Sequence, residues 1–196
     1  MRLSIIKEQC TVQQRTTARL ILRAPTLDDL SSLFSIYGDP ATHQFNPFGP
    51  LKSVKQARSV LDGWLAHWAL KGYGQWAIST REAPGKVIGF GGIDARMYLD
   101  VERLNLGYRF GVQAWGQGYA TELGQAALDY GFDELRVPEV FAVVRPQHYA
   151  SIRVLEKIGM QRIDTLADVP GQAPSLVYHS RREDVPPAFG ADPVPL

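Results

Sequence analysis

The sequence predicts a single α+β domain built on a mixed, mostly antiparallel sheet, and three observations carry that prediction. One strand–helix–strand unit is clear, between residues 104 and 144, and parallel pairing of strands needs such a crossover. Three consecutive strand signals precede it, which favours an α+β sheet over a doubly wound parallel sheet. The chain has 196 residues with no internal repeat and no linker strong enough to divide it, so one domain accounts for the length.

The N-terminal part predicts a strand followed by a helix. Residues 1–17 are polar and mixed, which indicates a lead-in or an edge strand, and residues 18–23 begin with the alternation of a strand. Thr26 is the expected N-cap of the first helix, with Asp29 three residues later as an Asp version of the capping box. The apolar side chains of residues 30–37 then recur at helical spacing, and the helix is expected to end near Gly38.

A loop and a second helix come next. Residues 39–51 hold three prolines and Gly49, which predicts a loop. Ser53 is positioned to cap a helix whose apolar face runs to Trp68 and which Gly72 ends.

The second half supplies most of the sheet. Alternation, short apolar runs and glycine stops predict the remaining elements: strands over 76–80, 87–93, 104–110, 140–144 and 176–179, a glycine-rich turn over 111–118, and helices over 120–132 and 148–158. The expected domain therefore spans residues 18–182. It is followed by a proline-rich tail, 183–196, without periodicity.

Composition excludes several classes of protein. The formal net charge is +1, which gives no support for a nucleic-acid partner or a polybasic membrane anchor. No stretch approaches the roughly 18 apolar residues of a membrane span, and the N-terminus lacks the apolar core of a secretory signal. Cys10 is the single cysteine, and the four histidines are far apart, so neither a disulfide nor a metal site is expected. A cytoplasmic location is the default expectation.

The glycine-rich turn is the segment that points to chemistry. A strand runs into Gly111, Gly116 and Gly118, and the turn opens directly into a helix whose first N–H groups have no partner within the helix. The helix dipole and the close approach that glycine permits make this a site for a phosphate or pyrophosphate. A tight turn without a ligand would use the same glycines. The segment lacks the Walker pattern and the full dinucleotide fingerprint, which excludes those two classes of nucleotide site.

Two motifs at matching distance resemble a known family. Trp115-Gly-Gln-Gly-Tyr-Ala-Thr-Glu122, followed by Ala150-Ser-Ile-Arg-Val-Leu-Glu-Lys-Ile-Gly-Met160, is similar to the GNAT acetyltransferases, and to their RimJ/RimL-type branch in particular. The opening Ala18-Arg-Leu-Ile-Leu-Arg23 with Asp28-Asp29 also resembles that branch. The resemblance covers roughly residues 18–180. It implies the GNAT fold, in which the two central parallel strands diverge, with acetyl-CoA as the cofactor.

The resemblance also implies a set of cofactor-binding residues. In the family, backbone amides of this turn bind the CoA pyrophosphate, and the strand that precedes it pairs with the pantetheine arm. The strand amide near Phe110 would hold the thioester carbonyl oxygen as charge develops. The positions that match here are Phe110, Gly111, Val112, Gly116, Gln117, Gly118, Tyr119, Ala120 and Thr121. Trp115 stands where Gln or Arg is usual.

Two departures from the family pattern affect the catalytic groups. The tyrosine that commonly protonates the leaving thiolate is replaced by Leu155, so Ser151 becomes the candidate for that role, although it would equally serve as a helix cap. His148 would either contact CoA or only begin the helix. Relatives often carry Glu where this chain has Asn105, which cannot accept a proton but can orient the amine or a water molecule.

The base and the acceptor stay open at this stage. Glu102, Asp94 and His179 are alternative bases, and the small neutral fraction of the amine is a further route. The acceptor is a protein N-terminal amine or a small-molecule amine. The loop over 39–51 is expected to wall its site, with Phe45, Phe48 and Tyr73 as aromatic candidates. A weakly catalytic CoA-binding or sensing module and an interaction protein on the same fold remain as alternative functions, and the sequence leaves homodimer formation open.

Overall fold

The computed structural model describes residues 14–182, which form one eight-stranded mixed sheet with helices on both faces. Its strand order is β1-β2-β3-β4-β5-β6-β8-β7, and every neighbouring pair is antiparallel except β5 and β6. The strands are β1 (Gln14–Thr16), β2 (Leu20–Arg23), β3 (Gln75–Thr80), β4 (Val87–Tyr98), β5 (Val101–Phe110), β6 (Glu139–Val144), β7 (Gln161–Leu166) and β8 (Ser175–Arg181). The predicted mixed, mostly antiparallel sheet is confirmed.

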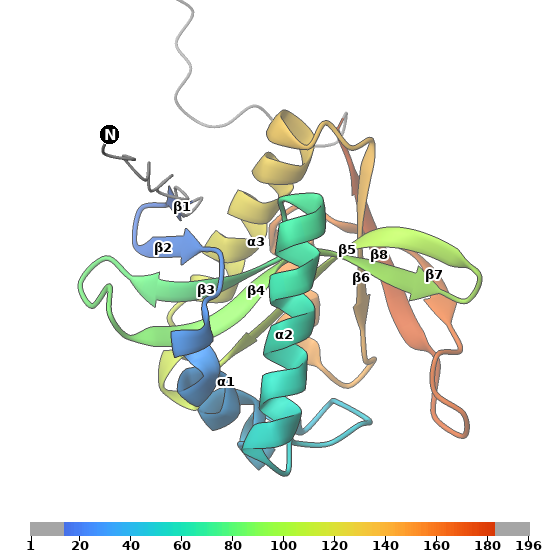
Figure 1. Ribbon diagram of the computed structural model, residues 1–196. Helices are drawn as coiled ribbons and strands as arrows, with labels where there is room; N and C mark the ends of the chain where they lie inside the picture. The colour runs from blue at the N-terminus through green and yellow to red at the C-terminus, as the bar shows by residue number, and fades with distance from the viewer. Residues whose placement is uncertain (1–13, 183–196) are drawn as a thin grey trace, which may run out of the picture.

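Two helices cover each face of the sheet. Figure 1 shows α2 crossing in front of the sheet and α3 behind it. Helices α1 (Leu30–Tyr37) and α2 (Val54–Lys71) pack on Ala77 and Phe90, whereas α3 (Tyr119–Asp129) and α4 (Tyr149–Lys157) pack on the opposite face, which includes Trp76 and Ile78. Shorter helical turns are η1 (Leu27–Asp29), η2 (Pro40–His43), η3 (Val112–Ala114) and the π-helical turn η4 (Tyr130–Glu134).

The predicted helix starts and stops are confirmed in the first half. The Thr26 amide donates to the Asp29 carboxylate at 2.7 Å, which completes the capping box, and the chain then continues from η1 into α1. Ser53 Oγ accepts from the Gln56 amide at 3.2 Å at the start of α2. Gly72, with φ +74°, ends α2 in the left-handed conformation that glycine adopts without strain.

Four sequence predictions differ from the structure. Strand β7 was not predicted, because five of its six residues are exposed and carry no apolar alternation. Strand β4 continues past Ile93 to form a hairpin with β5, since pairing with β5 fixes its polar end where periodicity gives no signal. The helix expected to reach residue 132 ends at Asp129 and passes into η4. Residues 40–43 of the predicted loop form η2, which begins at a proline.

The chain ends fall partly outside this description. Residues 14–16 of the expected lead-in form β1, so the edge-strand alternative is the one that the structure shows there. Residues 1–13, which include Cys10, and the proline-rich tail 183–196 lie outside the described residues.

The one parallel pair positions the site. Strands β5 and β6 meet in register at a single position, Asn105 opposite Phe141, and they diverge beyond it. All other pairs in the sheet hold at least three successive partners. The predicted divergence of the central parallel strands therefore opens the sheet in its middle, next to the N-termini of α3 and α4.

Candidate active site

A groove of about 780 Å³ lies between the turn that precedes α3 and the first turn of α4. Gly116 and Gly118 line it with φ of +73° and +76°, a backbone conformation that other residues adopt only with strain. The Trp115 indole donates to the Phe110 carbonyl at 2.9 Å and fixes the strand end against the turn. The glycines therefore shape the wall of the groove, beyond simply joining strand and helix.

The N-terminus of α3 presents unpaired amides to this groove. The first backbone bond of the helix runs from the Glu122 amide to the Gly118 carbonyl, at 3.1 Å. The amides of Tyr119, Ala120 and Thr121 thus have no partner within the helix, and all three residues line the groove. Together with the positive end of the helix dipole, they fit the pyrophosphate of CoA.

Residues between β1 and β2 hold the same turn in a clasp that sequence reasoning missed. Arg19 Nε donates to Glu122 at 2.7 Å, the Arg19 amide donates to the same carboxylate at 2.7 Å, and Arg19 Nη1 donates to the Gln117 carbonyl at 2.8 Å. Thr17 Oγ1 also hydrogen-bonds to Glu122. Burial opposes the charged form of Glu122, but these bonds outweigh it and lower the pKa of the carboxyl.

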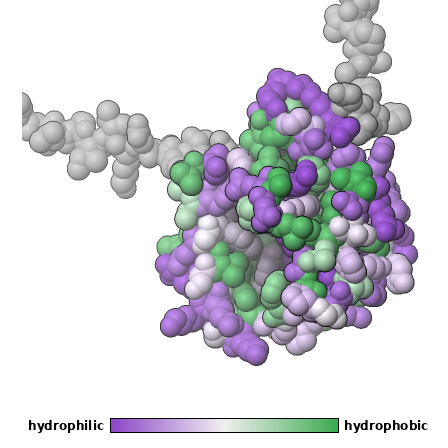
Figure 2. Space-filling view, turned by 90° about the vertical axis from the view of Figure 1, so that its right-hand side faces the viewer, coloured by the Kyte–Doolittle hydropathy of each residue, from purple (hydrophilic) through white to green (hydrophobic). Residues whose placement is uncertain are grey.

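The divergence of β5 and β6 contains a second cavity, of about 490 Å³, which we call the acceptor cavity. A hollow is visible on the face of the molecule shown in Figure 2. The cofactor groove and the acceptor cavity share five lining residues: Phe45, Asn46, Tyr108, Arg109 and Ser151. A molecule in one cavity and a molecule in the other would therefore meet at these residues.

Two hydroxyl groups lie at this junction. Tyr108 Oη and Ser151 Oγ are 2.9 Å apart, one from β5 and the other from the first turn of α4. Burial raises the pKa of Tyr108 to about 12, so the phenol stays protonated near neutral pH. Leu155, which the resemblance places where a tyrosine is expected, is 2% exposed and belongs to the core. The sequence singled out Ser151 but not Tyr108, whose only signal was its place two residues before the end of the strand.

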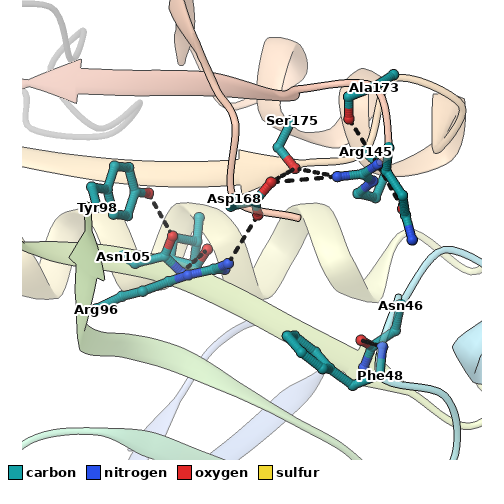
Figure 3. Close-up of polar contacts among 11 residues, drawn as sticks. Asn46, Phe48, Arg96, Tyr98, Asn105, Arg145, Asp168, Ala173 and Ser175 are labelled. Atoms are coloured by element: carbon teal, nitrogen blue, oxygen red, sulfur yellow. Dashed lines mark hydrogen bonds and ion pairs between the residues drawn. The ribbon is translucent and has the colours of Figure 1, made fainter. Parts of the chain in front are cut away.

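Asn105 is buried and lines the acceptor cavity, where its amide is hydrogen-bonded on both sides. Its oxygen accepts from Tyr98 Oη at 2.7 Å, and its nitrogen donates to the Leu106 carbonyl at 3.0 Å (Figure 3). Burial raises the pKa of Tyr98, which keeps the donor protonated.

None of the three alternative bases lines either cavity within residues 14–182. Asp94 pairs with His67 at 3.2 Å, His179 lies 3.4 Å from Glu139, and Glu102 is exposed on the β4–β5 hairpin.

The loop expected to wall the acceptor site contributes residues to the lining of both cavities. Phe45 lies at the junction and stacks on His148 with ring centroids 4.3 Å apart, and Phe48 lines the acceptor cavity. Tyr73, predicted as a third aromatic, lines neither cavity, because its ring packs against His67 and the main core. Burial, followed by the charge of Arg109, lowers the pKa of His148.

Most predicted cofactor residues line the groove, and three do not. Phe110, Gly116, Gly118, Tyr119, Ala120, Thr121, His148 and Ser151 line it. Gly111, Val112 and Gln117 lie in the same turn without lining the groove; the Gln117 carbonyl instead accepts from Arg19.

Between residues 14 and 182, no helix combines the length and apolarity that a membrane crossing requires. The same residues contain no group of three or more His, Cys, Asp or Glu side chains that could hold a metal ion.

Comparison with known proteins gives consistent matches. The family described as "Acetyltransferase (GNAT) domain" matches residues 19–161. The chain is 35% identical over 156 residues to the uncharacterized protein YkkB of Bacillus subtilis, covering 76% of this chain and 86% of that one. It is 32% identical over 155 residues to the uncharacterized N-acetyltransferase p20 of Bacillus licheniformis, covering 78% and 84%. The spermidine N-acetyltransferase from Vibrio cholerae, in complex with CoA and spermine, superposes with a TM-score of 0.70 at 16% identity, covering 86% and 98%.

Proposed function

The chain belongs to the GNAT acetyltransferase family, whose cofactor is acetyl-CoA, and we propose that it transfers the acetyl group directly to a primary amine bound in the acceptor cavity. One observation carries the proposal: the cofactor groove and the acceptor cavity meet at the Tyr108–Ser151 pair. Direct attack needs both reactants to reach one point with their reacting atoms in contact. A shared junction with proton donors supplies that point.

The chain's own groups have separable tasks at this junction. The amides of Tyr119, Ala120 and Thr121 bind the pyrophosphate, and acetyl-CoA supplies an activated thioester. The amine nitrogen bonds to the carbonyl carbon as the carbon–sulfur bond breaks. Ser151 donates its proton to the departing sulfur, Tyr108 replaces the proton that Ser151 gives up, and solvent then returns a proton to Tyr108.

The proton of the amine leaves by a different route. Asp168 is the one carboxylate among the described residues lining the acceptor cavity, and its oxygens face Arg145, Ser175 and Arg96. Asn105 accepts no proton. We therefore propose that the amine reacts from its small neutral fraction and that water takes up the proton which nitrogen loses as the amide forms, with Asn105 shaping the wall of the cavity.

The acceptor is a protein N-terminal amine or a small-molecule amine. The motifs over 115–122 and 150–160 support a place in the RimJ/RimL-type branch, which is compatible with either class. A fold does not fix a substrate, so the acceptor must come from the cavity itself.

Calorimetry with acetyl-CoA, and with NAD and ATP as controls, tests the cofactor half of the proposal. Selective binding of acetyl-CoA is expected. Release of CoA thiol, measured with a panel of amines, then tests transfer. If well-folded protein binds acetyl-CoA but none of the amines causes release of CoA thiol, the proposed transfer is contradicted.

A further inference from the structure

Resting on the proposed transfer to an amine, we propose that the acceptor is a small amine that also carries a carboxylate, as an amino acid does. Arg109 binds that carboxylate in the acceptor cavity. The cavity volume, about 490 Å³, lies within the range of small-molecule sites.

The charges of the acceptor cavity carry the first step. Its lining contains the guanidiniums of Arg96, Arg109 and Arg145 against the single carboxylate of Asp168. Asp168 lies between Arg96 and Arg145 in Figure 3, with contacts of 3.5 Å and 3.4 Å. The described lining is therefore positive by two charges when those four side chains are ionised, and a negative group on the acceptor would complement it.

Arg145 has a structural task that uses its donors. Nη1 donates to Ser175 at 3.0 Å, and Nη2 donates to Gln172 and to the Ala173 carbonyl, both at 2.8 Å. These bonds tie the segment between β7 and β8 to the end of β6. Arg145 thus holds Asp168 and its loop in place.

Arg109 is the cation left without a carboxylate. No acidic side chain within residues 14–182 forms an ion pair with it; its neighbours are the His43 ring and the face of Tyr37, 4.3 Å from the guanidinium carbon. Burial, followed by the charge of Arg109, lowers the pKa of His43 to about 4, so that ring is neutral at pH 7. Charged side chains withdrawn from water are normally paired, which makes Arg109 a site for an anion.

The remaining cation, Arg96, is only loosely paired and adds to the positive charge of the lining. The Arg96 side chain is 43% exposed, and its contact with Asp168, at 3.5 Å, is long for a charge-assisted hydrogen bond. A polyamine would instead bring additional positive charge into this lining, which like-charge repulsion opposes.

Arg109 also lines the cofactor groove, so CoA is a competing partner. The amides at the N-terminus of α3 already supply a pyrophosphate site, and Arg153 and Lys157 supply further positive charge to the same groove. CoA binding therefore does not depend on Arg109. The two assignments differ in one measurable quantity, the affinity for acetyl-CoA after Arg109 is replaced.

The test compares amino acids with their amides and with spermidine. Rates are expressed as kcat/KM for the neutral amine, because amidation lowers the ammonium pKa. Amino acids are expected to exceed their amides by about 10- to 100-fold, the value of a hydrogen bond to a charged group. Arg109→Met should abolish that preference with acetyl-CoA affinity unchanged, and Arg109→Lys should retain part of it. Arg58→Met, on the exposed face of α2, is the matched control and should change neither quantity.

Each outcome decides the question. If amides or spermidine react as fast as amino acids, or if the preference for amino acids survives Arg109→Met, the inference is overturned. The transferase proposal then stays intact. Loss of acetyl-CoA affinity in Arg109→Met assigns the residue to the cofactor and also overturns the inference. Where no amine turns over, which contradicts the transferase proposal, titration of the CoA-saturated protein decides: tighter binding of an amino acid than of its amide supports the carboxylate site, and no difference overturns it.

Discussion

The proton relay at the junction makes a prediction about two substitutions and their combination. Ser151→Ala removes one hydroxyl and Tyr108→Phe the other, and neither change leaves a large void. The two oxygens are 2.9 Å apart, so each variant breaks the same hydrogen bond. In a relay, the loss of either member interrupts the supply of a proton to the departing sulfur.

The expected magnitude follows from that hydrogen bond. A bond to a group that carries charge contributes about 1.5–3 kcal/mol, which corresponds to a fall of about 10- to 100-fold in kcat. Because both hydroxyls act in one chain, the double variant should be no slower than the slower single variant. The coupling energy should then be about as large as one single effect.

Thermal stability gives a second number. Ser151→Ala leaves the partly buried Tyr108 hydroxyl without its partner, at a cost of about 1–3 kcal/mol. For a domain of this size, that is a fall of about 2–12 °C in Tm.

The assay is release of CoA thiol at saturating acetyl-CoA, with Ser59→Ala on the exposed face of α2 as the control. Single-turnover measurements separate the chemical step from product release. Losses that add in the double variant would refute the relay, because they would show that the two hydroxyls act independently. An unchanged rate in Ser151→Ala would remove that residue from the chemical step.

Three further predictions concern the rest of the site. Gly118→Trp should weaken acetyl-CoA binding in calorimetry by at least about 10-fold, because the indole fills the groove and the left-handed backbone at Gly118 strains any other residue. Gly72→Trp, a control at a glycine with a matching φ, should leave that affinity unchanged. A folded Gly118→Trp variant with wild-type affinity would contradict the placement of the groove. Glu122→Gln should lower the free energy of unfolding, measured by denaturant titration, by about 1–3 kcal/mol at pH 7. Because the wild-type carboxyl has a lowered pKa, the difference between variant and wild type should shrink as the pH falls below about 4.5. A difference that stays constant with pH would contradict the clasp. The free energy of unfolding of the wild type should fall by up to about 3 kcal/mol as the pH is lowered from 6.5 to 4, because His43 gains a proton in the unfolded chain and not in the folded one. His43→Gln should lack this part of the pH dependence. Equal slopes of unfolding free energy against pH in the two proteins would refute the prediction.

The fold could be predicted from the sequence where local patterns and tertiary structure agree. The capping box at Thr26 and Asp29 and the cap at Ser53 are local devices, and each begins a helical segment where expected. Strand β7 shows the opposite case, since its exposed residues are fixed by pairing with β8 and not by their own periodicity. The divergence of β5 and β6 came from the family resemblance, because no local pattern encodes the absence of pairing.

The candidate site divides along the same line. The turn over 111–118 was found because glycine spacing and a helix start are visible in sequence. Arg19, which holds that turn, lies about a hundred residues away and looked like an ordinary strand residue. Tyr108 and Arg109 gain their significance from neighbours on α4 and in the loop over 39–51, and only the folded chain brings those together.

The missing carboxylate at Asn105 and the unpaired guanidinium of Arg109 have a common consequence for the amine. Both residues line the acceptor cavity, where the one carboxylate among the described lining residues, Asp168, contacts Arg96 and Arg145 and not Arg109. A nearby positive charge lowers the pKa of a bound ammonium, because like charge disfavours its protonated form. The α-ammonium of a free amino acid has a pKa above the roughly 7.7–8.0 of a chain N-terminus, because its own carboxylate stabilises the positive charge, and pairing that carboxylate with Arg109 removes this stabilisation. A lysine-type amine, at about 10.4, has no adjacent carboxylate to lose and would stay protonated. The charge that selects a carboxylate therefore also favours an amine that reacts without a base.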